Sequence, residues 1–123
     1  MAKYKFLNLN PINEREQDCV CRAISLALQE DYYLIERKLE LVGELFECEM
    51  LCCCCYKHLL DYVYGLERIE EVQGMTIEQF ATYFPKGTYI IRVNGHCTSV
   101  IDGICYDIWD CTNEFIDIVW EVK

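Results

Sequence analysis

Cys19 is the residue of this chain best placed for nucleophilic chemistry. It directly follows Asp18, a favourable N-cap residue, and the apolar residues Val20 and Ile24 then recur at helical spacing. A thiol in the first turn of a helix faces unpaired backbone N–H groups and the positive end of the helix dipole, which lower its pKa. Cys21 points to another side of the same helix, and we interpret it as structural. The sequence therefore predicts a reactive thiol at Cys19.

A thiolate nucleophile normally works with a histidine, and the chain contains two. His58 lies in the middle of a cysteine-rich segment with helical periodicity. His96 follows the turn-forming pair Asn94-Gly95 and opens a β-prone run. A position at the start of a strand leaves one end of the imidazole free to face a cleft, so we favour His96 as the base.

The pairing of the next hairpin suggests an acid for His96. If residues 102–103 form a two-residue turn, His96 lies opposite Trp109 and diagonal to Asp107 on the same face. The carboxylate of Asp107 would then hold the imidazole in the correct tautomer and stabilise its cationic form. Asp110 is the alternative acid, on the other face in strict register unless a bulge reverses it.

The motifs around these candidates resemble those of a known family. The segments concerned are NP (10–11), DCVCRAI (18–24), PKGTYII (85–91), GH (95–96), VIDG (100–103), YDIWD (106–110) and VWE (119–121). Together they resemble small papain-like cysteine peptidase-related proteins of phages and Gram-positive bacteria, and the resemblance covers about residues 10–30 and 76–121. The cysteine-rich middle of the chain has no counterpart in this resemblance.

The resemblance implies a papain-like fold with a Cys-His-Asp triad. Cys19 would be the nucleophile, His96 the general base and Asp107 the residue that orients the histidine. An amide side chain six residues before the nucleophile would donate to the oxyanion, which here is Asn13. Gln17 and Asn10 are alternatives, and the backbone N–H of Cys19 would be the second donor.

The elements that must position these residues follow from hydrophobic periodicity and turn chemistry. Helices first and strands afterwards indicate one α+β domain over 1–123, with the first helix packed on the sheet. An N-terminal arm and loop (1–17) precedes a mainly helical part (18–84) and an antiparallel meander of about four strands (88–122). The expected helices start at 18, 31, 44 and 77. Gly43 ends or bends the second, and the third runs to 64. A short strand is expected near 68–72.

Three further features of the sequence, a capping box, an arginine and a CxC pair, lead to predictions. The box Thr76–Gln79 predicts the start of the fourth helix, which ends near Phe84. Arg22 is expected to pair with an acidic residue and lock the first helix. A redox role for Cys19 and Cys21 is disfavoured, because the CxC spacing lacks the usual CxxC geometry.

Ten cysteines are present in the chain, and we expect most of them to be reduced thiols that pack as small hydrophobes. Cys48, Cys52, Cys55 and His58 fall near one helical face and include good zinc ligands. Ligand sets taken from one helix are uncommon, so packing is the favoured interpretation. We therefore expect no metal and no cofactor.

The composition of the chain limits the classes of partner and the cellular location that we expect. The formal charge of −10 repels phosphate backbones, so we expect no nucleic-acid ligand. No apolar run approaches the roughly 20 residues that cross a bilayer, and the start of the chain lacks a signal-peptide core, so we expect a cytoplasmic protein with no membrane partner.

Two functions are consistent with these observations. The leading hypothesis is a cysteine-dependent hydrolase, of peptidase, isopeptidase or amidase type, that acts on a peptide or protein through an acyl-enzyme on Cys19. The alternative is a catalytically inactive, acidic phage or mobile-element protein that binds and inhibits a basic host protein.

Overall fold

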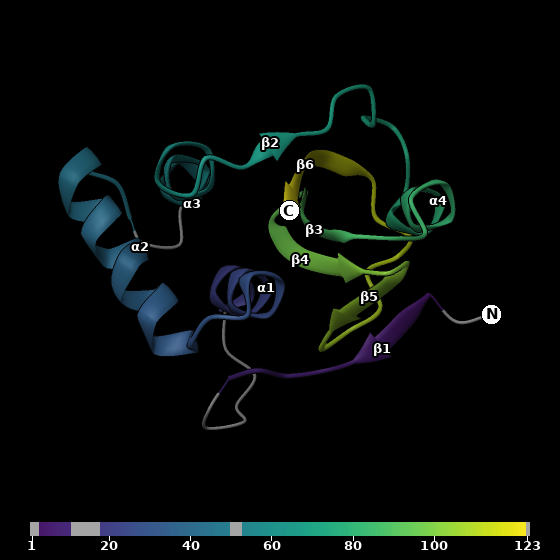
Figure 1. Ribbon diagram of the computed structural model, residues 1–123, viewed down its shortest axis with the longest axis horizontal. Coiled ribbons are helices and arrows are strands. Elements are labelled where there is room, and N and C mark those ends of the chain that lie inside the picture. The colour runs from purple at the N-terminus through teal and green to yellow at the C-terminus, as the bar shows by residue number, and fades with distance from the viewer. Residues whose placement is uncertain (1–2, 11–17, 50–52, 123) are drawn as a thin grey trace.

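The computed structural model of the protein describes residues 3–10, 18–49 and 53–122. The described part is α+β, as the sequence predicts: helices pack on one six-stranded mixed sheet (Figure 1). The helices are α1 (Cys19–Leu28), α2 (Tyr32–Phe46), α3 (Cys53–His58), the π-helical segment η1 (Leu59–Val63) and α4 (Ile77–Tyr83). The strands are β1 (Tyr4–Phe6), β2 (Glu67–Arg68), β3 (Thr88–Val93), β4 (His96–Ile101), β5 (Ile104–Asp107) and β6 (Ile116–Val122).

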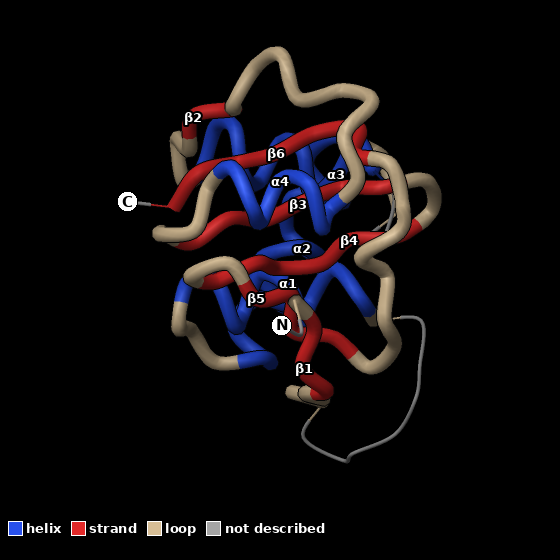
Figure 2. Tube along the Cα trace, turned by 90° about the vertical axis from the view of Figure 1, so that its right-hand side faces the viewer, coloured by secondary structure: helices blue, strands red, loops and turns tan. Residues whose placement is uncertain are grey.

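The strand order is β1-β5-β4-β3-β6-β2, which Figure 2 shows from bottom to top. The two predicted hairpins are present: β3 pairs with β4 around Asn94-Gly95, and β4 pairs with β5 around Asp102-Gly103. The four-strand meander is wrong, because β6 returns to pair antiparallel with β3 instead of following β5. β1 runs parallel to β5 and occupies the edge that a fourth meander strand would take.

Helices cover both faces of the sheet. α1, α2 and α3 lie on one face and α4 on the other (Figure 1). The core divides accordingly, and one cluster joins the first three helices to Ile90 and Trp120, while the other joins α4 to Ile91 and Val119. Neighbouring residues of β3 thus enter different clusters, because successive side chains of a strand point to opposite faces.

Two of the predicted helices differ from the structure. α2 begins after the cap of Asp31, whose carboxylate accepts from Leu34 N at 3.1 Å, but it continues through Gly43 to Phe46. One glycine costs a helix only about 1 kcal/mol relative to alanine, which the packing of this helix offsets. The predicted third helix of 44–64 is divided: its first residues belong to α2, and helix resumes at Cys53 and widens into η1.

The region around α4 follows its local signals. The predicted capping box is present: Thr76 Oγ1 accepts from Gln79 N at 3.2 Å, and Gln79 Oε1 accepts from Thr76 N at 2.9 Å. The predicted strand of 68–72 is shorter and begins earlier: Glu67 and Arg68 form β2 and pair with β6, and Ile69 adds one backbone hydrogen bond to Val119.

Candidate active site

Cys19 is the first residue of α1, as predicted, and its half-buried side chain faces β4. α1 packs against β4, which brings the thiol to His96 and to the backbone of Cys97. Burial alone raises the pKa of the Cys19 thiol, but hydrogen bonds to the His96 side chain and the Cys97 backbone outweigh it. The pKa of this thiol is therefore lowered, which favours the nucleophilic thiolate. Cys21 on the same helix is buried, and burial raises its pKa to about 12.

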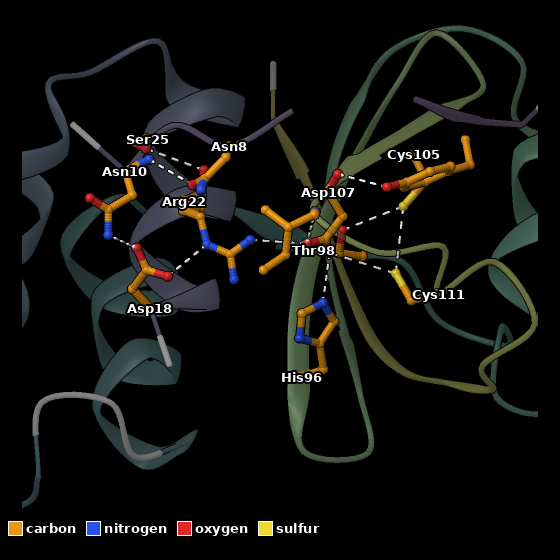
Figure 3. A network of polar contacts seen from close by, with 12 residues as sticks. Asn8, Asn10, Asp18, Arg22, Ser25, His96, Thr98, Cys105, Asp107 and Cys111 are labelled. Carbon is orange, nitrogen blue, oxygen red and sulfur yellow. Dashed lines mark hydrogen bonds and ion pairs between the residues drawn. The ribbon is translucent and has the colours of Figure 1, made fainter. Parts of the chain in front are cut away.

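His96 is the first residue of β4 and lies directly after the Asn94-Gly95 turn. Its Nε2 lies 2.6 Å from Asp107 Oδ2. Burial disfavours the imidazolium, but hydrogen bonds to Asp107, Cys111 and Cys19 outweigh it and raise the pKa of His96 to about 11. Since Nε2 is engaged by Asp107, the second ring nitrogen is the one left for the thiol, and Figure 3 shows it on the side of the ring that faces α1.

Asp107 is the last residue of β5, and only 3% of it is exposed. The hairpin register pairs Ser99 with Tyr106, as the two-residue turn at 102–103 requires, so Asp107 lies diagonal to His96 as predicted. Burial raises the pKa of Asp107, but the hydrogen bonds to His96 and Thr98 outweigh it and hold the pKa below its usual value. Its carboxylate is therefore an anion beside the imidazole.

Arg22 connects the sheet side of the site to α1. Its Nη1 donates to Asp107 Oδ1 at 3.0 Å, and its Nε donates to Asp18 Oδ1 at 2.7 Å. All three side chains are buried. Figure 3 shows the resulting chain, which runs from Asp18 through Arg22 to Asp107 and His96. The predicted pairing of Arg22 with an acid is confirmed, and the pairing extends into the candidate site.

Asp18 occupies the N-cap position of α1, as predicted, and its backbone carbonyl accepts from Arg22 N at 3.0 Å, but its side chain does not act as a cap. Its side chain makes no cap hydrogen bond to the start of α1. The carboxylate instead accepts from Arg22, from Tyr32 Oη at 2.7 Å and from Asn10 Nδ2 at 3.0 Å. These three donors draw it away from the helix end, so its charge anchors Arg22.

The other predicted site residues have different outcomes. Asp110 is exposed, and its Oδ1 accepts from Thr112 N at 3.0 Å and from Thr112 Oγ1 at 2.5 Å, so it stabilises a turn. The oxyanion candidates Asn13 and Gln17 lie outside the described residues. Asn10 is buried and gives its amide to Asp18. The structure thus brings together Cys19, His96 and Asp107, and leaves Asp110 out.

The cysteine-rich helix does not form a ligand cluster in the described residues. Cys55 is fully buried and its Sγ contacts the carbonyl oxygen of Leu39 at 3.2 Å, while His58 Nδ1 contacts the carbonyl oxygen of Cys54 at 2.7 Å. Packing is therefore the role of Cys55. Cys52, a member of the same predicted set, lies outside the described residues.

A pocket of about 140 Å³ opens beside the thiol and the imidazole. Val20 and Tyr56 contribute apolar surface to it, and Arg92 contributes a charged group. A carbonyl carbon placed in this pocket would lie beside Cys19 and His96.

The sequence did not predict the full role of two residues of the site, Arg22 and Cys111. The i, i+4 spacing of Asp18 and Arg22 signals an ion pair, but nothing local signals the second partner of Arg22. Cys111 was not singled out, although its Sγ lies 3.6 Å from Asp107 Oδ2. It lies four positions after the end of β5, where the strand register of the hairpin no longer predicts the position of a side chain.

Comparison of the chain with models of protein families, with curated proteins and with solved structures gave no match. Among the helices that the structure describes, none combines the length and the apolar character needed to cross a membrane.

Proposed function

We propose that this protein is a cysteine-dependent hydrolase that cleaves amide, isopeptide or thioester bonds of a peptide or protein substrate. The single observation that supports it most is that the Cys19 thiol and His96 line the same pocket, while Nε2 of this histidine is bound to a buried carboxylate. The thiol pKa is lowered and the histidine pKa is raised, which favours a thiolate–imidazolium pair. A papain-like relationship agrees with this arrangement and belongs to the same proposal.

The reaction follows from the positions of these groups. The Cys19 thiolate attacks the carbonyl carbon, and the carbonyl electron pair moves to oxygen. The tetrahedral intermediate then collapses to a thioester as the imidazolium of His96 gives its proton to the leaving amine or thiol. Water next attacks the thioester carbonyl as His96 takes its proton, and the thiolate leaves, which regenerates the enzyme and releases an acid. Asp107 acts as a positioning residue throughout, because it contacts the imidazole and not the substrate.

The oxyanion requires donors near the thiol. The backbone N–H of Cys19 is the donor that we assign, since it belongs to the open first turn of α1. We place the reaction in the cytoplasm, because the nucleophile acts only as a reduced thiol.

The proposal is tested by mapping the site of a thiol-reactive electrophile at a substoichiometric dose. We expect one dominant adduct on Cys19, which a Cys19→Ala variant loses. Cys54→Ala is the matched control, because Cys54 is an exposed thiol outside the site, and this variant should keep the adduct on Cys19. Faster labelling of Cys54 than of Cys19 in the wild type would refute the proposal.

A second candidate function, binding and inhibition of a basic host protein, is favoured by one surface. Leu45, Tyr62 and Val63 are 78%, 77% and 60% exposed, and Leu45 and Val63 line a mostly apolar groove of about 200 Å³ between α2 and η1, to which Lys38 also contributes. Contiguous exposed apolar surface marks interaction sites. If expression of the chain slows growth of a bacterial host, Cys19→Ala should abolish the effect of a hydrolase, whereas Leu45→Glu should abolish the effect of a binder.

A further inference from the structure

Cys111 is a buried thiol beside the histidine and the carboxylate, and the proposed reaction does not use it. Its Sγ lies 3.6 Å from Asp107 Oδ2, and the same carboxylate oxygen lies 2.6 Å from His96 Nε2. One ligand atom of each of these three residues lies within 4.8 Å of the other two. Figure 3 shows the three side chains converging from the sheet side of the site.

We propose that His96, Asp107 and Cys111 form a zinc-binding site, and that zinc bound there switches the hydrolase off. The binding itself is independent of the proposed function; only the inhibition rests on it. Zinc prefers imidazole, thiolate and carboxylate ligands, and a three-ligand site leaves its fourth position to water.

One of the three separations between ligand atoms already suits a tetrahedral ion. Bonds of zinc to nitrogen, oxygen and sulfur place neighbouring ligand atoms about 3.3–3.6 Å apart. The oxygen of Asp107 and the sulfur of Cys111 already have this separation, at 3.6 Å. The nitrogen of His96 must move away from the carboxylate oxygen, which lies 2.6 Å from it. His96 is the first residue of β4, next to the Asn94-Gly95 turn, and it lines the pocket of about 140 Å³.

The charges also favour zinc. Asp18 and Asp107 are two buried carboxylates with one arginine, Arg22, between them. Zinc binding removes one proton from Nε2 of His96 and one from Cys111. The Cys19 thiolate loses its imidazolium partner and takes up one proton, so the net release to the solvent buffer is one proton. With a neutral imidazole and a thiolate, the three negative groups are then balanced by Arg22 and the dication. The carboxylate of Asp107 can keep its Oδ1 on Arg22, because zinc needs only Oδ2.

Inhibition follows from which nitrogen the metal takes. Zinc on Nε2 removes Asp107 from its orienting role and leaves the remaining ring proton on Nδ1. The neutral ring then has no free lone pair, so it cannot accept a proton from the Cys19 thiol or from water. Turnover stops until the metal is removed.

Zinc binding is measured by competition with a chromophoric chelator. We expect the wild type to bind one equivalent of zinc tightly. Cys111→Ala should lose this equivalent or bind it at least tenfold more weakly. Cys105→Ser is the matched control, because Cys105 is equally buried and its Sγ lies 3.7 Å from Cys111 Sγ but outside the ligand set; it should keep the equivalent. Equal zinc binding by wild type and Cys111→Ala, or no tight equivalent in the wild type, would overturn the site.

A second measurement on the wild type remains decisive if Cys111→Ala does not fold. The chain has two histidines, so the side-chain nitrogen spectrum contains two imidazoles, and a His58→Ala variant assigns them. One equivalent of zinc should shift the Nε2 resonance of His96 and leave His58 in place. A shift of His58 alone, or of neither ring, would contradict the site.

The regulatory part has its own readout. Zinc should lower the hydrolysis rate of an activated ester at least tenfold in the wild type, a chelator should restore it, and Cys111→Ala should resist zinc. Cys19→Ala should retain zinc binding, so failure of the hydrolase proposal leaves the metal test intact. Labelling on Cys19 without any tight zinc would instead retain the hydrolase and reject the metal site.

Discussion

At the scale of single residues, the site is a series of side chains of alternating charge that spans three elements, α1, β4 and β5. Asp18, Arg22, Asp107 and His96 contact one another in that order, and Cys19 completes the series at the imidazole. Each buried charge therefore has an opposite charge beside it, as burial of ionised groups requires.

Part of this series follows from the sequence alone. The two turn pairs fix the hairpin register, and the register places Asp107 beside His96. The contact of Arg22 with Asp107 spans 85 positions and depends on how α1 docks on the sheet. The hydrogen bonds from Tyr32 and Asn10 to Asp18 likewise depend on tertiary packing, so the local pattern predicts the N-cap position of Asp18 but not the partners of its carboxylate.

Removal of Arg22 should strongly destabilise the protein, because this arginine lies between two buried carboxylates. Arg22→Ala leaves two buried carboxylates without their cation, and we expect a loss of about 3–5 kcal/mol in the free energy of unfolding, measured by urea denaturation. Arg37→Ala is the control, because Arg37 forms an exposed pair with Glu40, and it should cost at most about 1 kcal/mol. Equal losses in the two variants would show that Arg22 stabilises the protein no more than an exposed ion pair does.

At the scale of elements, local sequence signals predict a helix or hairpin correctly where the segment itself determines its structure. α1, α4 and both hairpins follow from periodicity, capping and turn pairs. The return of β6 to β3 and the parallel pairing of β1 with β5 do not, because strand partners far apart in sequence are chosen by burial and by free edges. The widening of α3 into η1 has no local signature that we can identify.

The capping box of α4 gives a prediction at this scale. Thr76→Ala removes the oxygen that accepts from Gln79 N, and we expect it to lower the free energy of unfolding by about 1 kcal/mol. Thr82→Ala, in the body of the same helix, replaces a hydroxyl that bonds the carbonyl of Glu78, and it should change stability by less than half as much. Urea titrations followed by circular dichroism give both values, and a larger loss for Thr82→Ala would contradict this account of α4.

At the scale of the whole molecule, the sheet lies between two core clusters and couples them. Trp120 is buried in the cluster of α1 to α3, whereas Phe80 is buried in the cluster of α4. Because β3 and β6 contribute residues to both clusters, we expect the two sides to unfold together.

Phe80→Ala tests this coupling. Truncation of a buried phenylalanine should cost about 3–5 kcal/mol. In a Trp109→Phe background, the fluorescence of Trp120 reports the opposite cluster, and its urea midpoint should fall with an unchanged slope. A midpoint of Trp120 that stays in place while the helical signal shifts would mean that the two clusters unfold independently.

The contact between Cys19 and His96 is tested most directly by the pH dependence of alkylation at Cys19. The lowered thiol pKa keeps the thiolate at a pH below the ordinary cysteine pKa of about 8.5. The rate constant, read by mass spectrometry on the peptide that contains Cys19, should therefore rise at a pH below that value and then stay high, because the thiolate persists once it has formed. In His96→Ala the rise should move to higher pH, because the thiolate loses its cationic partner. The same midpoint in the wild type and in His96→Ala would contradict the account.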